Sequence, residues 1–279
     1  MAKFDGKYFS GPIGRVIFRK HRGQQVVYQK CLKDNIAQTE KTVKASKVFG
    51  KASRLTSCIR MLLMKLTLSN FDSNISNRLI GEVTAILNGC VIPETPFFQF
   101  LGPSFQKLIG FELNIKSPFK SRFFSQPTIY YANNLVQIVL PEMVILEKIK
   151  FPRGISDCKI VISMSELDLR NGKYSNADVQ VIDLNKVNEH SILPQQQITF
   201  STEPGTLCII GICLQFYEAT YLGNNLVNTK AFSPAAILNA YYLEGTVNKE
   251  NTSDWHDFHF KNEVPILLPA IDLPNHTAA

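Results

Sequence analysis

From residue 128 onward, short runs of β-forming residues alternate with turn residues, and this pattern constrains the fold more than any other feature of the chain. Asn171-Gly172 and Gly223-Asn224 are typical turn sequences. No helical patterns separate the runs, as a βαβ fold would require, and no glycine-rich phosphate loop is present. The pattern therefore predicts a mainly antiparallel β-sandwich over residues 91–279 and disfavours a doubly wound nucleotide-binding fold. The expected strands are residues 128–131, 136–140, 160–164, 179–182, 198–201, 206–217 and 236–242.

Residues 39–90 carry the clearest helical periodicity. Thr39 fits an N-cap and Glu40 a first turn, where its charge suits the helix dipole. A second helix is expected from Asp72 to about Leu87. An antiparallel helical pair over 39–90 is the simplest way to bury both apolar faces. In the first helix, one face is formed by Ala45, Val48, Ala52, Leu55, Ile59, Leu62 and Leu66.

Residues 1–38 predict a basic N-terminal arm that contains a β-hairpin. Residues 15–19 and 25–29 are rich in β-branched and aromatic side chains, and Lys20 to Gly23 supply a polar turn. Gly11, Pro12 and Gly14 indicate a tight bend before the hairpin. Since two strands alone are marginally stable in water, the hairpin has to pack on its own protein or add to a neighbour's sheet. The predicted fold class is thus α+β: a basic hairpin, a helical pair and a sandwich.

Positive charge is concentrated at the N-terminal end. Residues 1–66 hold 15 Lys or Arg and three acidic residues, a net charge of +12, whereas the remainder holds 15 against 20, a net charge of −5. Such a module suits a polyanion or an acidic protein surface, including the acidic part of another copy. For the Lys and Arg residues of the first helix, the alternative to binding a partner is that they form a solvated face. The residues predicted to contact a partner are Arg15, Phe18, Arg19, Lys20, Arg22, Tyr28, Lys44, Lys47, Lys51 and Arg54.

The six cysteines contain no C-x-x-C pair and several lie in apolar runs, so we expect mostly buried, reduced thiols. In a strand, the odd separation of Cys208 and Cys213 would place them on opposite faces. No apolar stretch reaches the roughly 20 residues of a membrane-spanning helix, and no signal peptide is recognisable at the start. Cytoplasmic synthesis is expected, with incorporation into an assembly released from the cell as one possibility.

A search for catalytic groups finds one candidate. Asp254, His256, Asp257 and His259 flank the single tryptophan and could bind a divalent metal. On an extended strand, however, successive side chains alternate between faces and do not converge, which favours a polar surface strand. Glu142, Glu147, Glu166 and Asp168 follow no spacing rule for an acid/base pair, and we expect surface charges. No enzyme activity, cofactor, metal or small-molecule substrate is therefore predicted.

Three functions remain open from the residues. The first is a structural protein that self-associates through its basic hairpin and helix into a filament, tubule or particle. The second is a DNA-, RNA- or ribosome-binding protein that uses the same basic surface against phosphates. The third is a hydrolase or lectin-like sandwich, for which only the residues around His256 argue.

Several segments resemble known proteins. The run GPIGRVIFRK from Gly11, the later Val26-Val27-Tyr28, and a Thr-Glu-Lys helix opening followed by Phe49-Gly50-Lys51-Ala52 resemble the N-terminal part of uncharacterised Bacteroidota proteins. The remainder of those proteins is a predicted β-sandwich, and residues 208–218 are similar to one of its late strands. The family has no established activity. The resemblance implies a two-part architecture and favours a bacterial accessory or assembly role over an enzyme.

Overall fold

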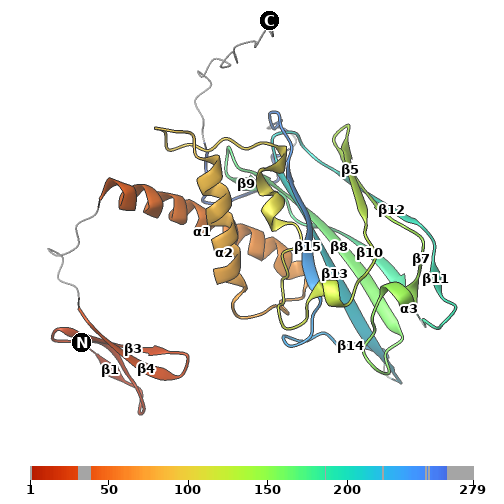
Figure 1. The fold of residues 1–279 in the computed structure, drawn as a ribbon, viewed down its shortest axis with the longest axis horizontal. Coiled ribbons are helices and arrows are strands. Elements are labelled where there is room, and N and C mark those ends of the chain that lie inside the picture. Colours follow the sequence, from red (N-terminus) through yellow and green to blue (C-terminus); the bar gives the residue numbers. More distant parts are fainter. Residues whose placement is uncertain are drawn as a thin grey trace, which may run out of the picture. The chain divides into compact units, whose positions relative to one another are not determined.

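The computed structural model describes residues 2–30, 39–185, 187–221, 223–248, 250 and 252–262. The chain divides into two compact units, Met1–Lys47 and Val48–Ala279. The coarse prediction of a mixed α+β chain dominated by antiparallel strands is confirmed (Figure 1).

The first unit contains a four-stranded antiparallel sheet in the order β1-β2-β3-β4. The predicted hairpin is confirmed, because β3 pairs with β4 from Val16 opposite Gln29 to His21 opposite Gln24. Its turn is Arg22-Gly23, at φ of 50° and 80°, the left-handed values that a two-residue hairpin turn requires. Of the residues predicted to form a bend, Gly14 does open the turn between β2 and β3, whereas Gly11 and Pro12 lie inside β2. The strands are β1 (Lys3–Phe4), β2 (Phe9–Ile13), β3 (Val16–His21) and β4 (Gln24–Gln29).

Helix α1 (Glu40–Leu66) starts where predicted: the Thr39 Oγ1 accepts a hydrogen bond from the Thr42 amide at 3.2 Å. Its predicted apolar face is buried from Ala52 to Leu66, whereas Ala45 is exposed. Helix α2 (Ile75–Cys90) begins three residues after the predicted Asp72, whose carboxylate accepts the Asn74 amide at 2.7 Å and also binds Arg78. The helices do not bury their faces only against each other. Both pack into one core that also contains side chains of the large sheet.

The large sheet of the second unit has seven strands, and its two central strands are buried on both faces. Its centre is formed by β8 (Asp157–Asp168) and β13 (Leu207–Thr220), which pair antiparallel over eleven residues. Val161 and Ile209 point to the core shared with α1 and α2, while Ile160 and Ile210 point to a second core. At Gly211 an added Cβ would stand 2.6 Å from Leu66 Cδ2, so the absent side chain lets α1 approach the sheet. The remaining strands are β9 (Lys173–Tyr174), β10 (Asp178–Leu184), β14 (Gly223–Leu226), β15 (Ala235–Tyr242) and β16 (His256–Asp257).

The second core lies between the large sheet and a three-stranded sheet in the order β12-β6-β5. Figure 1 shows these strands on the side of the large sheet opposite α1 and α2. All seven predicted strands are present. The turn predicted at Gly223-Asn224 is wrong, because both residues belong to β14. The remaining elements are β5 (Thr128–Ala132), β6 (Leu135–Leu140), β7 (Met143–Val144), β11 (Ile192–Leu193), β12 (Gln196–Ser201), α3 (Ile145–Lys148), and the 3-10 helices η2 (Gly102–Leu108) and η3 (Phe119–Ser121).

The predicted state of the cysteines is confirmed where the structure describes them: Cys58, Cys158, Cys208 and Cys213 are free and buried, and Cys90 is half-buried. Cys213 lies in the core shared with the helices, on the face of β13 opposite Cys208, as the odd separation predicts. Cys31 lies outside the described residues. Within the described residues, the helices include none that is long and apolar enough to cross a membrane.

Candidate assembly interface

The N-terminal sheet has one predominantly apolar face. Residues opposite each other in an antiparallel pair project to the same side, so the pairing of Phe4 with Phe9 and of Phe18 with Val27 places these four side chains together. The Phe4 and Phe9 rings lie 4.7 Å apart, and the Phe9 and Phe18 rings 5.6 Å apart. The apolar face consists of Phe4, Phe9, Ile13, Val16, Phe18 and Val27.

This face is open to solvent. The exposed fraction is 59% for Phe4, 42% for Phe9 and 52% for Val27, and none of residues 2–30 is buried. Phe18, one of the predicted contact residues, is half-buried at its centre. A sheet without a buried side chain is poorly stabilised by its own packing, and a partner that covers the face would supply the missing burial.

The predicted basic residues are distributed around the sheet rather than gathered on one side. Arg19 and Tyr28 project to the face opposite Phe18, Lys20 to the same face as Phe18, and Arg15 and Arg22 lie in the turns. All five are exposed. Positive charge therefore lies on both faces of the sheet and in its turns.

One acidic residue partly offsets this charge. The Asp5 carboxylate accepts hydrogen bonds from the amides of Tyr8 and Lys7, which lower its pKa below the ordinary value, and its Oδ2 lies 4.0 Å from Lys20 Nζ. Lys20 also lies over the Tyr8 ring, 4.7 Å from its centre. These contacts fix the loop between β1 and β2.

The four predicted helical cations divide between the two units. Lys44 and Lys47 lie in the first unit and are exposed. In the second unit, Lys51 Nζ donates a hydrogen bond to the Lys261 carbonyl and lies 5.3 Å from the centre of the Phe260 ring. Arg54 Nη1 donates to the His259 carbonyl at 3.3 Å. These two cations attach the last described segment to α1, a structural role that the periodicity alone did not reveal.

A cavity of about 590 Å³ lies beside these contacts. It is lined by Lys51, Arg54, Asp257, Phe258, His259 and Lys261. His256 belongs to β16, where its Nε2 lies 3.2 Å from the Asn176 amide nitrogen and its ring lies against Tyr174. Across the described part of the chain, no three His, Cys, Asp or Glu side chains are grouped so as to hold a metal ion. His256 and Asp257 pair with Tyr174 and Lys173 of β9 and so form an edge of the large sheet.

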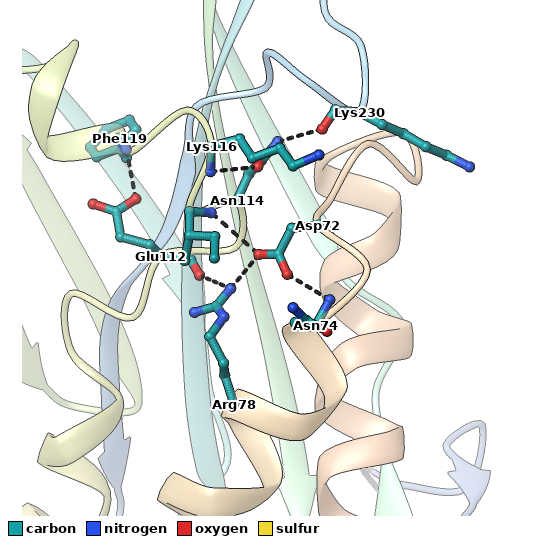
Figure 2. A network of polar contacts seen from close by, with 9 residues as sticks. Asp72, Asn74, Arg78, Glu112, Asn114, Lys116, Phe119 and Lys230 are labelled. Carbon is teal, nitrogen blue, oxygen red and sulfur yellow. Dashed lines mark hydrogen bonds and ion pairs between the residues drawn. The ribbon is translucent and has the colours of Figure 1, made fainter. Parts of the chain in front are cut away.

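A polar network joins the start of α2 to the segment that follows it (Figure 2). Arg78 Nη2 lies 2.5 Å from Asp72 Oδ2 and 2.9 Å from the Glu112 carbonyl. The Glu112 carboxylate accepts the Phe119 amide at 2.6 Å, and Asn114 donates to the Lys230 carbonyl at 3.1 Å. The hydrogen bonds named here all join groups of the chain itself, although the buried Arg78 Nε has no hydrogen-bond partner among the described residues. The network is a structural anchor, which sequence reasoning missed because its members are distant in sequence and carry no motif.

Glu166 is buried, and no Lys or Arg among the described residues forms an ion pair with it. Its Oε1 accepts hydrogen bonds from Thr202 Oγ1 at 2.8 Å, the Glu203 amide at 2.7 Å and Thr206 Oγ1 at 3.1 Å. Burial nevertheless raises the pKa of this carboxyl above its ordinary value, and burial also raises the pKa of the neighbouring Cys208 to about 12. A thiol with that pKa stays protonated at neutral pH and is a poor nucleophile.

The four acidic residues considered for acid/base chemistry have separate environments. Glu142 and Glu147 are exposed, as expected, whereas Glu166 and Asp168 are buried and the expectation of surface charges is wrong for them. The Asp168 carboxylate closes the turn after β8 by accepting the amides of Arg170 and Asn171, both at 3.0 Å.

Comparison with known proteins adds no functional assignment. No protein-family model matches the chain, and no curated protein matches it.

Proposed function

We propose that the chain is a non-enzymatic structural protein that self-associates through its N-terminal unit into a larger bacterial or phage-like assembly. The observation that carries the proposal is the N-terminal sheet, whose apolar face is exposed and whose residues 2–30 include no buried side chain. Exposed contiguous apolar surface surrounded by polar groups is characteristic of protein interaction sites. The second unit, which we classify as a β-sandwich with a helical layer, supplies the rigid body of the subunit because its central strands β8 and β13 are buried on both faces.

Self-association explains the charge distribution as well. Seven Lys or Arg and one acidic residue lie within residues 2–30, whereas residues 67–279 carry a net negative charge. Opposite charges on two surfaces of one chain favour contacts in which one subunit's arm meets the next subunit's body. Contacts of that kind are heterologous and generate rings or filaments.

The test is sedimentation velocity of the full chain after nuclease treatment, over a wide concentration range. We expect the weight-average sedimentation coefficient to rise with protein concentration and negative-stain images to show regular particles or fibres. Uniform monomers at every concentration would contradict the proposal.

Nucleic-acid binding is the alternative function. It is favoured by the exposed cations of the N-terminal sheet and of α1, which are Arg15, Arg19, Lys20, Arg22, Lys44 and Lys47. A protein that neutralises six to ten phosphates loses about 10³–10⁵ in affinity between 50 and 200 mM salt. Mobility-shift titrations with single- and double-stranded DNA and RNA at both salt concentrations separate the two functions. A monomeric protein with that salt dependence would support the alternative.

A further inference from the structure

Strand β4 is an edge strand that lacks the usual protection against pairing. Within the described residues it pairs only with β3. Its sequence, QQVVYQ, contains no charged residue and no proline, and its register with β3 is unbroken. Natural edge strands are normally protected by charges, proline or bulges. An unprotected six-residue edge is a template for an added strand.

The direction of the free amides in β4 follows from one hydrogen bond. The Lys30 amide donates to the Arg15 carbonyl at 2.7 Å, so the pair formed by Arg15 and Lys30 is hydrogen-bonded. Hydrogen-bonded and non-hydrogen-bonded pairs alternate along an antiparallel ladder. The amides of Gln25, Val27 and Gln29 therefore point away from β3, toward the open edge.

The second unit has a matching open edge at β10. This strand pairs with β8 from Asp178 opposite Met164 to Leu184 opposite Cys158, and the described residues form no ladder on its other side. The exposed fraction is 41% for Val179 and 46% for Val181. The strand contains two aspartates, Asp178 and Asp183, and no Lys or Arg. Asp183 pairs with Lys159 of β8 at 2.9 Å, so Asp178 supplies most of the negative charge at this edge.

Other edges of the second unit fit less well. The outer side of β15 is occupied, because Gly110 donates to the Ile237 carbonyl at 2.8 Å and Ile237 donates to the Phe111 carbonyl at 2.9 Å. Strands β5, β12 and β14 contain no charged residue. The edge strand β16 carries Asp257 but has only two residues. Among the described open edges of four or more residues, β10 is thus the one that contains acidic residues, opposite in charge to the N-terminal sheet.

We propose that β4 of one subunit pairs with β10 of a second copy of this chain, so that the N-terminal sheet of one and the large sheet of the other become continuous. The proposal rests on the self-association proposed above and specifies its interface. Pairing of β4 with another β4 is disfavoured, because it would bring two basic sheets together. Main-chain hydrogen bonds supply affinity in such strand addition, and the side chains and charges at the edge supply selectivity.

The test uses substitutions at each edge. Val27→Pro removes an outward-facing amide, a change that an edge strand tolerates but an added strand does not. Val27→Thr keeps the amide and is the matched control. On β10, Val181→Lys places a cation where the basic sheet would bind, and Val181→Thr is its control. Circular dichroism and thermal unfolding verify that each full-length variant is folded.

Sedimentation velocity of nuclease-treated protein should show monomers for Val27→Pro and for Val181→Lys, and oligomers for both threonine controls. An equimolar mixture of the two monomeric variants should form dimers and stop there, because only one functional β4 and one functional β10 are present in each pair. Gln29→Pro, which removes a second outward amide, should reproduce Val27→Pro.

Two results would contradict the β4–β10 interface without contradicting self-association. The first is that Val181→Lys or Val27→Pro forms oligomers like those of the unmodified chain. The second is that the mixture stays monomeric although the unmodified chain associates. An unmodified chain that is monomeric at every concentration would instead refute the proposed function itself.

Discussion

Asp72 holds α2 in place through a single strong ion pair with Arg78. The exposed side-chain fractions are 3% for Asp72 and 27% for Arg78. Asp72→Asn leaves the guanidinium without its counter-charge, and breaking a buried pair in this way costs about 3 kcal/mol. We expect the free energy of unfolding, measured by urea titration, to fall by that amount. Asp183→Asn is the control, since its 2.9 Å pair with Lys159 is solvent-exposed and should cost less than about 1 kcal/mol. Equal losses would contradict the structural role of Asp72.

Glu166 should make stability depend on pH in an unusual direction. Because burial raises its pKa above the ordinary value of 4.5, the folded state binds more protons than the unfolded state as pH rises above 4.5. Stability is then lost as pH rises through the folded pKa. Glu166→Gln keeps an oxygen that accepts from Thr202 and Thr206 and removes the ionisation. We expect a higher free energy of unfolding at pH 7 and a flatter pH profile, measured by urea titration at several pH values. Glu142→Gln, at an exposed position, should leave the profile unchanged; an unaltered profile in Glu166→Gln would exclude this explanation.

At the level of elements, the contact between α1 and β13 depends on the missing side chain of Gly211. An added Cβ would stand 2.6 Å from Leu66 Cδ2 and 2.8 Å from Leu63 Cδ2. Gly211→Ala should therefore destabilise the chain by about 1–3 kcal/mol through overpacking. Gly81→Ala is the matched control, because no atom lies within 4 Å of its added Cβ and alanine favours a helix by about 0.8–1 kcal/mol. In thermal unfolding, we expect the midpoint to fall for Gly211→Ala and to rise for Gly81→Ala. An unchanged midpoint for Gly211→Ala would contradict this packing.

The elements that sequence reasoning predicted well are those with a strong local pattern. The run of β-forming residues over 206–217 predicted β13, and the Thr39 cap predicted the start of α1. Strands β1 and β2 were missed because Lys3–Phe4 is too short for a pattern, and because Gly11 and Pro12 are read as turn residues. The roles of Lys51 and Asp72 depend on partners far away in the sequence, which spacing does not reveal.

At the level of the whole molecule, the proposed association depends on the first unit, whereas the buried cores that stabilise the fold lie in the second. The cores contain no described residue of the N-terminal sheet, since the buried hydrophobic residues begin at Ala52. A subunit built in this way can vary its contacts without weakening its body. The candidate interface was predicted in outline from charge, but its apolar face emerges only from the pairing of β1 and β2 with the hairpin.

This separation predicts opposite outcomes for two substitutions. Phe9→Ser, on the apolar face, should weaken self-association by about tenfold or more, because burying one phenylalanine contributes about 1.5–3 kcal/mol and about 1.4 kcal/mol corresponds to a factor of ten. The thermal unfolding midpoint of the second unit should not change.

Leu79→Ala, at a fully buried position of α2, should lower the free energy of unfolding by about 2–5 kcal/mol and leave association of the folded protein intact. Ser10→Ala, whose side chain lies on the other face of β2, should affect neither quantity. Sedimentation velocity and calorimetry on the same samples measure both, and association lost in Leu79→Ala but kept in Phe9→Ser would place the interface on the body alone.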